Sequence, residues 1–273
     1  MKRLTLDGER LMAIKNIVVH QDRTKNCATR LKVAAAIGKQ HGAHIKVVFA
    51  RGGWKESISE SAQDAKAEFQ TLMAGVDAEW VEADAFNPDK NLVDQLLWHT
   101  CHSDMVIVGQ YNEHDHGFAP KTLVEQMMLE SGRPVLVIPH VWKLATLGDR
   151  VMVAWDRKRE STRAVNDALP LLQQASLVEL VAVTSKKPAP DRKFDRCADL
   201  ATHLGYHGIT AVTNNLIARD IDIANLLLSI ITDGDIDMVV MGGYGHARLR
   251  ETVLGGVTKD LLAQMPVPVL MSH

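Results

Sequence analysis

The chain repeats itself, and this repeat restricts the folds open to it more than any other feature of its sequence. KNIVVHQD resembles RVMVAWD, DMVIVGQY resembles DMVVMGGY, and PVLVIPH resembles PVLMSH. The three pairs keep one order and one offset of 133 or 134 residues, which indicates two copies of a single structural unit. We therefore expect a first domain at residues 1–142 and a second domain at residues 149–273.

Each copy alternates short apolar runs with segments of helical periodicity, the pattern of a parallel sheet covered by helices. The sequence predicts an α/β fold of two doubly wound units, each a five-stranded parallel sheet with helices on both faces. We expect strands near residues 15–20, 45–50, 78–83, 105–109 and 134–138, then 150–155, 178–183, 209–213, 237–241 and 267–271. We expect helices near 26–41, 57–73 and 90–101, then 160–175, 191–205, 220–233 and 255–264.

Composition excludes several classes of protein. Of the 273 residues 46% are hydrophobic and the net charge is -2, which is typical of a chain that buries a core and not of a disordered one. With 31 basic and 33 acidic residues, the chain has no overall positive field for nucleic acid. No apolar run reaches the roughly 18 residues of a membrane span, and acidic residues interrupt the N-terminal segment that a signal peptide needs.

We therefore expect a cytoplasmic protein that has neither nucleic acid nor a membrane as a partner. Its apolar strands PVLVI and PVLM favour pairing at sheet edges, within the chain or in a homodimer. The three cysteines, Cys27, Cys101 and Cys197, are too far apart for a disulfide framework or a metal knuckle. We expect reduced, buried thiols.

Ligands of an open parallel sheet bind at the carboxyl ends of its strands, where the strand order reverses. At one such end, residues 238–262 read MVVMGGYGHARLRETVLGGVTKDLL, so glycines follow a strand and precede a helix. Backbone N–H groups of such a loop and of a helix N-terminus form an anion site. Thr258 can add a hydroxyl donor, and His246, Arg248 or Arg250 can add charge. Gly243 is expected to serve a tight turn.

The order Gly242, two residues, Gly245, nine residues, Gly255 is similar to the nucleotide loop of the universal stress protein family. VAWDRKRESTRAVNDALPLL resembles that family's first strand and helix, and VTKDLLAQMPVPVLMSH its last helix and strand. The resemblance covers nearly the whole chain as two tandem domains. It implies a Rossmann-like fold, pairing of the domains through their last strands, and a bound adenine nucleotide: ATP, with ADP or AMP as alternatives.

The resemblance also assigns roles to individual residues. Asp156 matches the acidic residue that contacts the nucleoside, and Val183 matches the apolar position that lines the adenine pocket. Gly242, Gly245 and Gly255 match the phosphate-loop glycines, and Val257 with Thr258 matches the start of the helix beneath the phosphates. Gly256 stands where the family usually has Ser or Thr, and its backbone N–H remains as a donor. Arg157 and Lys158 stand where Gly-Ser is common, and they either crowd the nucleoside or offer charge to a polyphosphate.

The first copy has lost this loop. Its three glycine positions fall at Gly109, Asn112 and Thr122, and the nearby Asp115 would repel a phosphate. We expect no ATP in this half, although Asp22 corresponds to Asp156. His114 and His116 can bind a metal with Asp115 or Glu113, but a solvated polar loop is the favoured interpretation.

No catalytic set emerges from the sequence, since Ser161 and Thr162 have the composition of helix-capping residues and no nucleophile elbow occurs. The favoured function is a stress-response regulator that binds adenine nucleotide in the second domain with little or no hydrolysis. Two alternatives stay open. One is a protein-interaction module that uses no nucleotide, and the other is a binder of another small anionic or acyl ligand in the same crevice.

Overall fold

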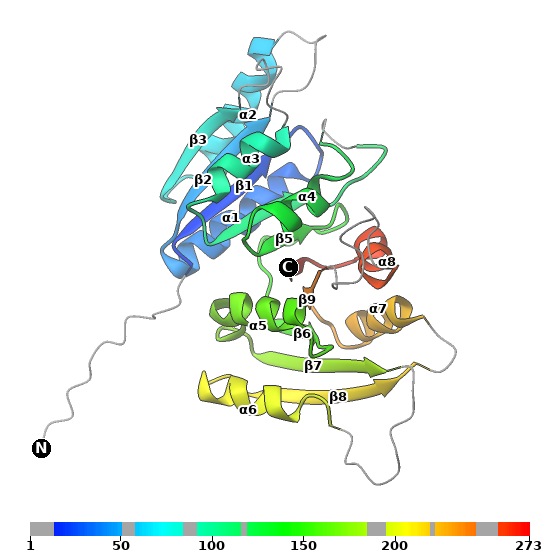
Figure 1. Ribbon diagram of the computed structural model, residues 1–273. Coiled ribbons are helices and arrows are strands. Elements are labelled where there is room, and N and C mark those ends of the chain that lie inside the picture. Colours follow the sequence, from blue (N-terminus) through cyan, green and yellow to red (C-terminus); the bar gives the residue numbers. More distant parts are fainter. Residues whose placement is uncertain are drawn as a thin grey trace, which may run out of the picture.

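The computed structural model describes residues 14–50, 58–83, 92–115, 119–184, 195–218, 222–243 and 256–273. Within these residues, one sheet is formed by strands β1 (Asn16–Gln21), β2 (His44–Ala50), β3 (Ala78–Ala83), β4 (Met105–Gly109), β5 (Val135–Ile138), β6 (Arg150–Ala154), β7 (Leu177–Thr184), β8 (Ala211–Ile217), β9 (Met238–Gly242) and β10 (Val269–Ser272). It is flanked by helices α1 (Cys27–His41), α2 (Ile58–Leu72), α3 (Leu92–Thr100), α4 (Leu123–Glu130), α5 (Arg159–Leu172), α6 (Ala198–Tyr206), α7 (Ile223–Asp233) and α8 (Gly256–Gln264) (Figure 1).

The sheet consists of two equivalent halves, β1–β5 and β6–β10. The strand order is β3-β2-β1-β4-β5-β10-β9-β6-β7-β8, so each half has the same order counted from its own edge strand. Neighbouring strands are parallel throughout, except at the centre, where β5 and β10 pair antiparallel with Leu136 opposite Leu270. The predicted α/β class with two five-stranded units is confirmed.

The inner strands are apolar along their whole length because both faces of the sheet are covered. MVIVG of β4 and MVVMG of β9 are buried except at their last residue, as expected of parallel strands between two helical layers. In the first half α1 packs beside α2 and α3 beside α4, and in the second half α7 packs beside α8. Every strand that was predicted is present within a few residues of its expected bounds.

Several details differ from the sequence prediction, among them α4, which was not one of the expected helices. The strand expected at 209–213 runs from Ala211 to Ile217 instead, because β8 is an edge strand and accepts the polar residues Thr213 and Asn214. Cys101 is exposed at the end of α3, so the expectation of a buried thiol is wrong there, whereas Cys27 and Cys197 are buried.

The repeated DMV sequence has a structural role. Asp104, just before β4, accepts backbone hydrogen bonds from Lys15 and Asn16 at 2.7 and 2.9 Å, where the chain enters β1. Asp237, just before β9, accepts three such bonds at 3.0 Å from the segment that enters β6. These carboxylates join the start of β4 to the start of β1 and the start of β9 to the start of β6. The repeated aspartate therefore stabilises the fold of each half.

Besides the pairing of β5 with β10, equivalent positions after β4 and β9 each contact a helix of the other half. The Gln110 side chain, after β4, donates from Nε2 to the Leu262 carbonyl at the end of α8 at 2.7 Å. At the equivalent place after β9, Gly243 lies so close to Met128 of α4 that an added Cβ atom would overlap the Met128 sulfur. The absence of a side chain at Gly243 therefore leaves room for the Met128 side chain.

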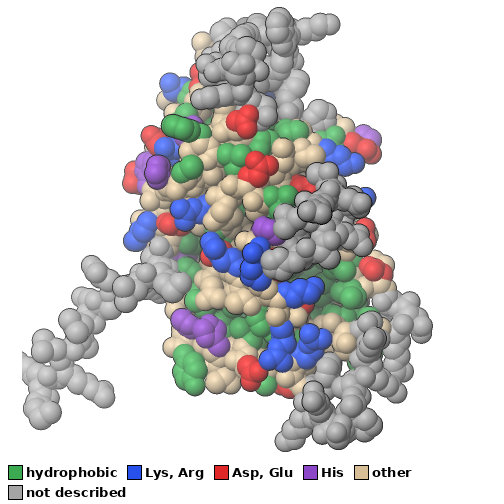
Figure 2. Space-filling view, viewed as in Figure 1, with side chains coloured by type: hydrophobic (Ala, Val, Ile, Leu, Met, Phe, Trp, Pro, Cys, Tyr) green, Lys and Arg blue, Asp and Glu red, His purple; other side chains and the backbone are tan. Residues whose placement is uncertain are grey.

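Charge is unevenly distributed on the surface. Lys and Arg side chains gather across the middle and lower part of the face in Figure 2, whereas Asp and Glu lie mostly on its upper part and at its edges. None of the helices that the structure describes is long and apolar enough to cross a membrane.

Candidate functional site

A cavity of about 500 Å³ opens at the carboxyl ends of β6, β7 and β9, beside the first turn of α8. This is the point where the strand order of the second half reverses. Six of the residues predicted for the site line it: Asp156, Val183, Gly242, Gly256, Val257 and Thr258. Gly245 and Gly255, like His246, Arg248 and Arg250, lie outside the described residues.

Asp156 follows β6 and is held in place by the start of α5. Its Oδ1 accepts hydrogen bonds from the Ser161 hydroxyl at 2.7 Å and from the Lys158 backbone N–H at 3.0 Å. The Lys158 ammonium lies 3.0 Å from Oδ2. Burial raises the pKa of Asp156, but the bonds from Ser161 and Lys158 outweigh it and hold the pKa below the ordinary 3.8. Asp156 is therefore an ionised hydrogen-bond acceptor at neutral pH.

Ser161 and Thr162 do not cap α5 as predicted. The N-cap position is Lys158, and the two hydroxyls donate to its carbonyl at 3.0 and 2.8 Å instead of accepting from the first N–H groups. Ser161 is buried, and its hydroxyl orients the Asp156 carboxylate. The sequence did not reveal this role.

Gly242 ends β9 and is required by packing. An added Cβ atom there would overlap the backbone of Glu160 and Ser161 in the first turn of α5. The glycine thus brings the helix, the strand end and the cavity close together.

The first turn of α8 lies on the wall of this cavity. Gly256 is the first helical residue, and a Cβ atom there would meet nothing within 4 Å. Thr258 is buried at 7% exposure and also lines the cavity. Unpaired N–H groups and the positive end of the helix dipole favour an anion at this place.

The two basic residues after Asp156 behave differently. Arg157 adopts a left-handed backbone with φ 67°, and its guanidinium pairs with Asp199 of α6 at 3.0 Å, so it does not crowd the cavity. Lys158 lines the cavity beside Asp156. Glycine would adopt this left-handed backbone without strain.

Sequence reasoning missed several residues of the cavity wall, among them Trp155, Glu160 and Arg196. Arg196 donates to the Asp156 carbonyl at 3.3 Å, although 40 residues separate the two in the chain. No local motif marks such a residue, because only the fold brings the start of α6 to the end of β6.

The equivalent place in the first half is occupied by an internal ion pair. Arg30 of α1 lies 2.8 Å from Asp22, and both side chains are 3% exposed. Burial raises the pKa of Asp22, but the Arg30 guanidinium more than offsets this with help from His20 and Thr24, so the pKa lies below its usual range. Arg30 also fills the space beside Gly109, where a Cβ atom would overlap its guanidinium.

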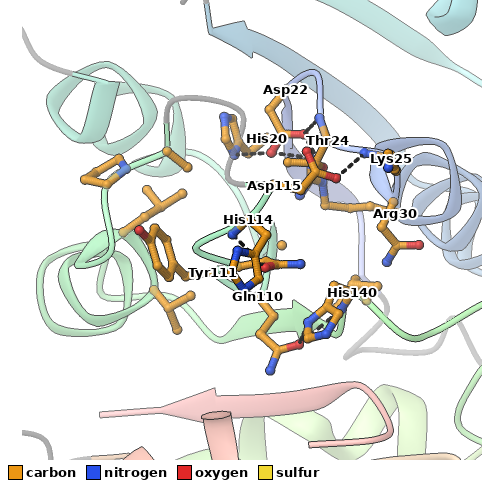
Figure 3. A pocket seen from close by; sticks show the side chains of 18 of the residues that line it. His20, Asp22, Thr24, Lys25, Arg30, Gln110, Tyr111, His114, Asp115 and His140 are labelled. Atoms are coloured by element: carbon orange, nitrogen blue, oxygen red, sulfur yellow. Dashed lines mark hydrogen bonds and ion pairs between the residues drawn. The ribbon is translucent and has the colours of Figure 1, made fainter. Parts of the chain in front are cut away.

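A smaller cavity of about 270 Å³ remains around this ion pair, and Figure 3 shows the side chains that line it. Asn112, His114 and Asp115 of the degenerate loop lie on its wall, and Asp115 accepts from the Lys25 backbone N–H at 2.9 Å. Thr122 is the N-cap of α4 and makes no capping bond with its side chain. His116 lies outside the described residues, and in those the structure does describe, no three His, Cys, Asp or Glu side chains are grouped to hold a metal ion.

Comparison with known proteins agrees with this architecture. Residues 148–273 match the universal stress protein family. The match covers the second half of the chain, which is similar to this family. No curated protein matches it.

Solved structures of the same fold extend over both halves of the chain. A universal stress protein from Archaeoglobus fulgidus DSM 4304 is 20% identical, with a TM-score of 0.71 over 93% of this chain and 97% of the other. A functionally unknown protein from Pseudomonas aeruginosa PAO1 is 12% identical, with a TM-score of 0.60 over 95% and 92% of the two chains. Similarity at these identities establishes the shared fold.

Proposed function

We propose that this chain is a universal stress protein that binds an adenine nucleotide in the cavity of its second half and acts as a nucleotide-responsive regulator. One observation carries the proposal: an ionised carboxylate, a strand-end glycine and a helix N-terminus line a single cavity of about 500 Å³. ATP is the favoured ligand, and ADP and AMP offer the same nucleoside with fewer phosphates.

Each part of a nucleotide has a counterpart on the cavity wall. Asp156 is an acceptor for ribose hydroxyls, because its other bonds already fix its orientation. The N–H groups at Gly256 and Val257, with the Thr258 hydroxyl, face the phosphates. The apolar part of the wall would enclose the base: Val181, Val183, Ile223 and Leu227.

The charges on the wall favour binding over catalysis. Lys158 and Arg196 can partner phosphate oxygens, while the Asp156 carboxylate is already held by Ser161 and Lys158. Donors that grip the phosphates equally before and during reaction stabilise the complex but give little rate enhancement. We therefore assign a sensor role with little or no hydrolysis, in which residues 149–273 form the nucleotide domain and residues 1–142 its partner.

Calorimetric titration of the full chain with ATP, ADP and AMP tests the proposal. Gly256→Leu adds a side chain at the cavity wall, where a Cβ atom meets no other atom, so the variant should fold and lose nucleotide binding. Gly205→Leu is the matched control, because Gly205 is a helical glycine in α6 with equally open space and lies outside the cavity lining. Equal binding by both variants would place the nucleotide elsewhere, and no binding by the parent chain would favour the interaction module.

A further inference from the structure

The first-half cavity contains buried polar atoms that the protein itself does not satisfy. Both ring nitrogens of His20, Oδ1 of Asn26 and Nε of Arg30 are buried without a hydrogen-bond partner among the described residues. His20 is fully buried and Arg30 is 2% exposed, and all three residues line the same space of about 270 Å³. Buried polar atoms are normally hydrogen-bonded, because leaving one unsatisfied is destabilising, so a cluster of them indicates a polar occupant.

The charges around this cavity favour an anion. Its wall carries the basic residues Lys25, Arg30 and Lys143 against the acidic residues Asp22 and Asp115. Both acids are engaged, Asp22 with the Arg30 guanidinium and Asp115 with a backbone N–H. The ammonium groups of Lys25 and Lys143 make no ion pair with the residues that the structure describes.

The same cavity is unsuited to a nucleotide. It has about half the volume of the second-half cavity, 270 against 500 Å³. Asn112 and Thr122 replace two phosphate-loop glycines, and the Arg30 side chain occupies the space beside the third, Gly109. Arg30 also neutralises Asp22, the counterpart of the residue assigned to the ribose.

We propose that the first-half cavity binds a small hydroxylated oxyanion, either a carboxylate or a phosphate monoester, at a site separate from that of the nucleotide. The anionic group lies toward Lys25 and Lys143, and the hydroxyl groups lie toward Asn26 and His20. Figure 3 shows His20 and Lys25 on the wall of this one cavity, with Gln110 and His140 opposite them. The chain thus combines two sites of different ligand class on one sheet.

The state of His20 supports the hydroxyl assignment. Burial lowers the pKa of His20 to about 4, more than the nearby Asp22 raises it. A neutral imidazole has one donor nitrogen and one acceptor nitrogen, which a hydroxyl group can satisfy.

The test is a calorimetric titration of the full chain with glycerate and with glycerol 3-phosphate, each with and without saturating ATP. Binding of either probe that ATP does not displace is expected, and the tighter probe identifies the anion. Lys25→Gln combined with Lys143→Gln should weaken binding about tenfold, since two partly solvated charge contacts are lost. Lys32→Gln is the matched control, an exposed lysine of α1 that does not line the cavity.

Three results would overturn the inference. They are no binding of either probe at millimolar concentration, unchanged binding by the double variant, and displacement of the probe by ATP. The first two leave the nucleotide proposal intact, because that proposal depends on Gly256 and the second cavity. Conversely, a chain that binds glycerate but ignores ATP would retain this site and lose the proposed nucleotide function.

Discussion

Mild acid should destabilise the fold through His20. This side chain is fully buried at the end of β1, and burial lowers its pKa from 6.5 to about 4, with the Arg30 charge adding to the effect and Asp22 opposing it. The folded protein therefore resists protonation of His20, whereas the unfolded chain takes up the proton near its ordinary pKa. The stability due to neutral His20 is complete above pH 6.5 and is lost as the pH falls from there toward 4.

The magnitude follows from the gap between the two pKa values. The pKa of His20 differs by about 2.5 between the unfolded and the folded chain. This difference corresponds to about 3 kcal/mol of the free energy of unfolding, which is lost in full at a pH below both pKa values. At pH 5 the unfolded chain is almost fully protonated at this site and the folded chain is mostly not. The free energy of unfolding should therefore fall by about 2 kcal/mol between pH 7 and pH 5 because of His20 alone.

Urea unfolding at pH 7 and pH 5 measures this contribution as the difference between the parent chain and His20→Gln. The parent should lose about 2 kcal/mol more than the variant, and His102→Gln, an exposed control, should behave as the parent does. Equal losses in the parent and in His20→Gln would refute the reasoning. An NMR titration of the His20 ring provides a second measurement, and a ring that titrates near pH 6.5 would contradict it as well.

Three further predictions follow from particular contacts. Arg157→Gly should raise the free energy of unfolding by about 0.5–1 kcal/mol in urea, because glycine adopts φ 67° without strain; a decrease would mean that the Asp199 pair matters more than the strain. Arg30→Met should lower the free energy of unfolding by about 3–5 kcal/mol, because it leaves Asp22 buried and unpaired. Adding Asp22→Asn should restore most of this stability. No restoration would contradict the ion-pair argument. Gln110→Leu should lower the free energy of unfolding by about 1–2 kcal/mol and speed hydrogen exchange in α8 but not in α3. Equal exchange in both helices would show that the bond from Gln110 does not hold α8.

The sequence was sufficient to predict the fold because the fold is repetitive and its strands are buried on both faces. Such strands appear as uninterrupted apolar runs like MVIVG, and two copies at one offset locate the equivalent elements. Residues around the second cavity could also be predicted from the sequence. Asp156 follows one strand and Gly242 ends another, and the carboxyl ends of these parallel strands must meet at one edge of the sheet.

What could not be predicted depends on contacts between distant segments. Arg30 belongs to a helix, where an arginine is usually exposed, and it turns inward only because Asp22 and Gly109 meet beside it in the fold. Arg196 reaches the second cavity from the start of α6, and Cys101 is exposed because α3 ends where it does. None of these outcomes leaves a periodic or local signal.

The stoichiometry of nucleotide binding tests the central claim most directly, because the claim is that two copies of one unit now bind different ligands. Equilibrium dialysis of the full chain against labelled ATP measures the number of sites per chain. We expect one ATP per chain, bound in the second half and lost in Gly256→Leu. Two ATP per chain would contradict the assignment of the first half to a smaller anion, and none would contradict the nucleotide site itself.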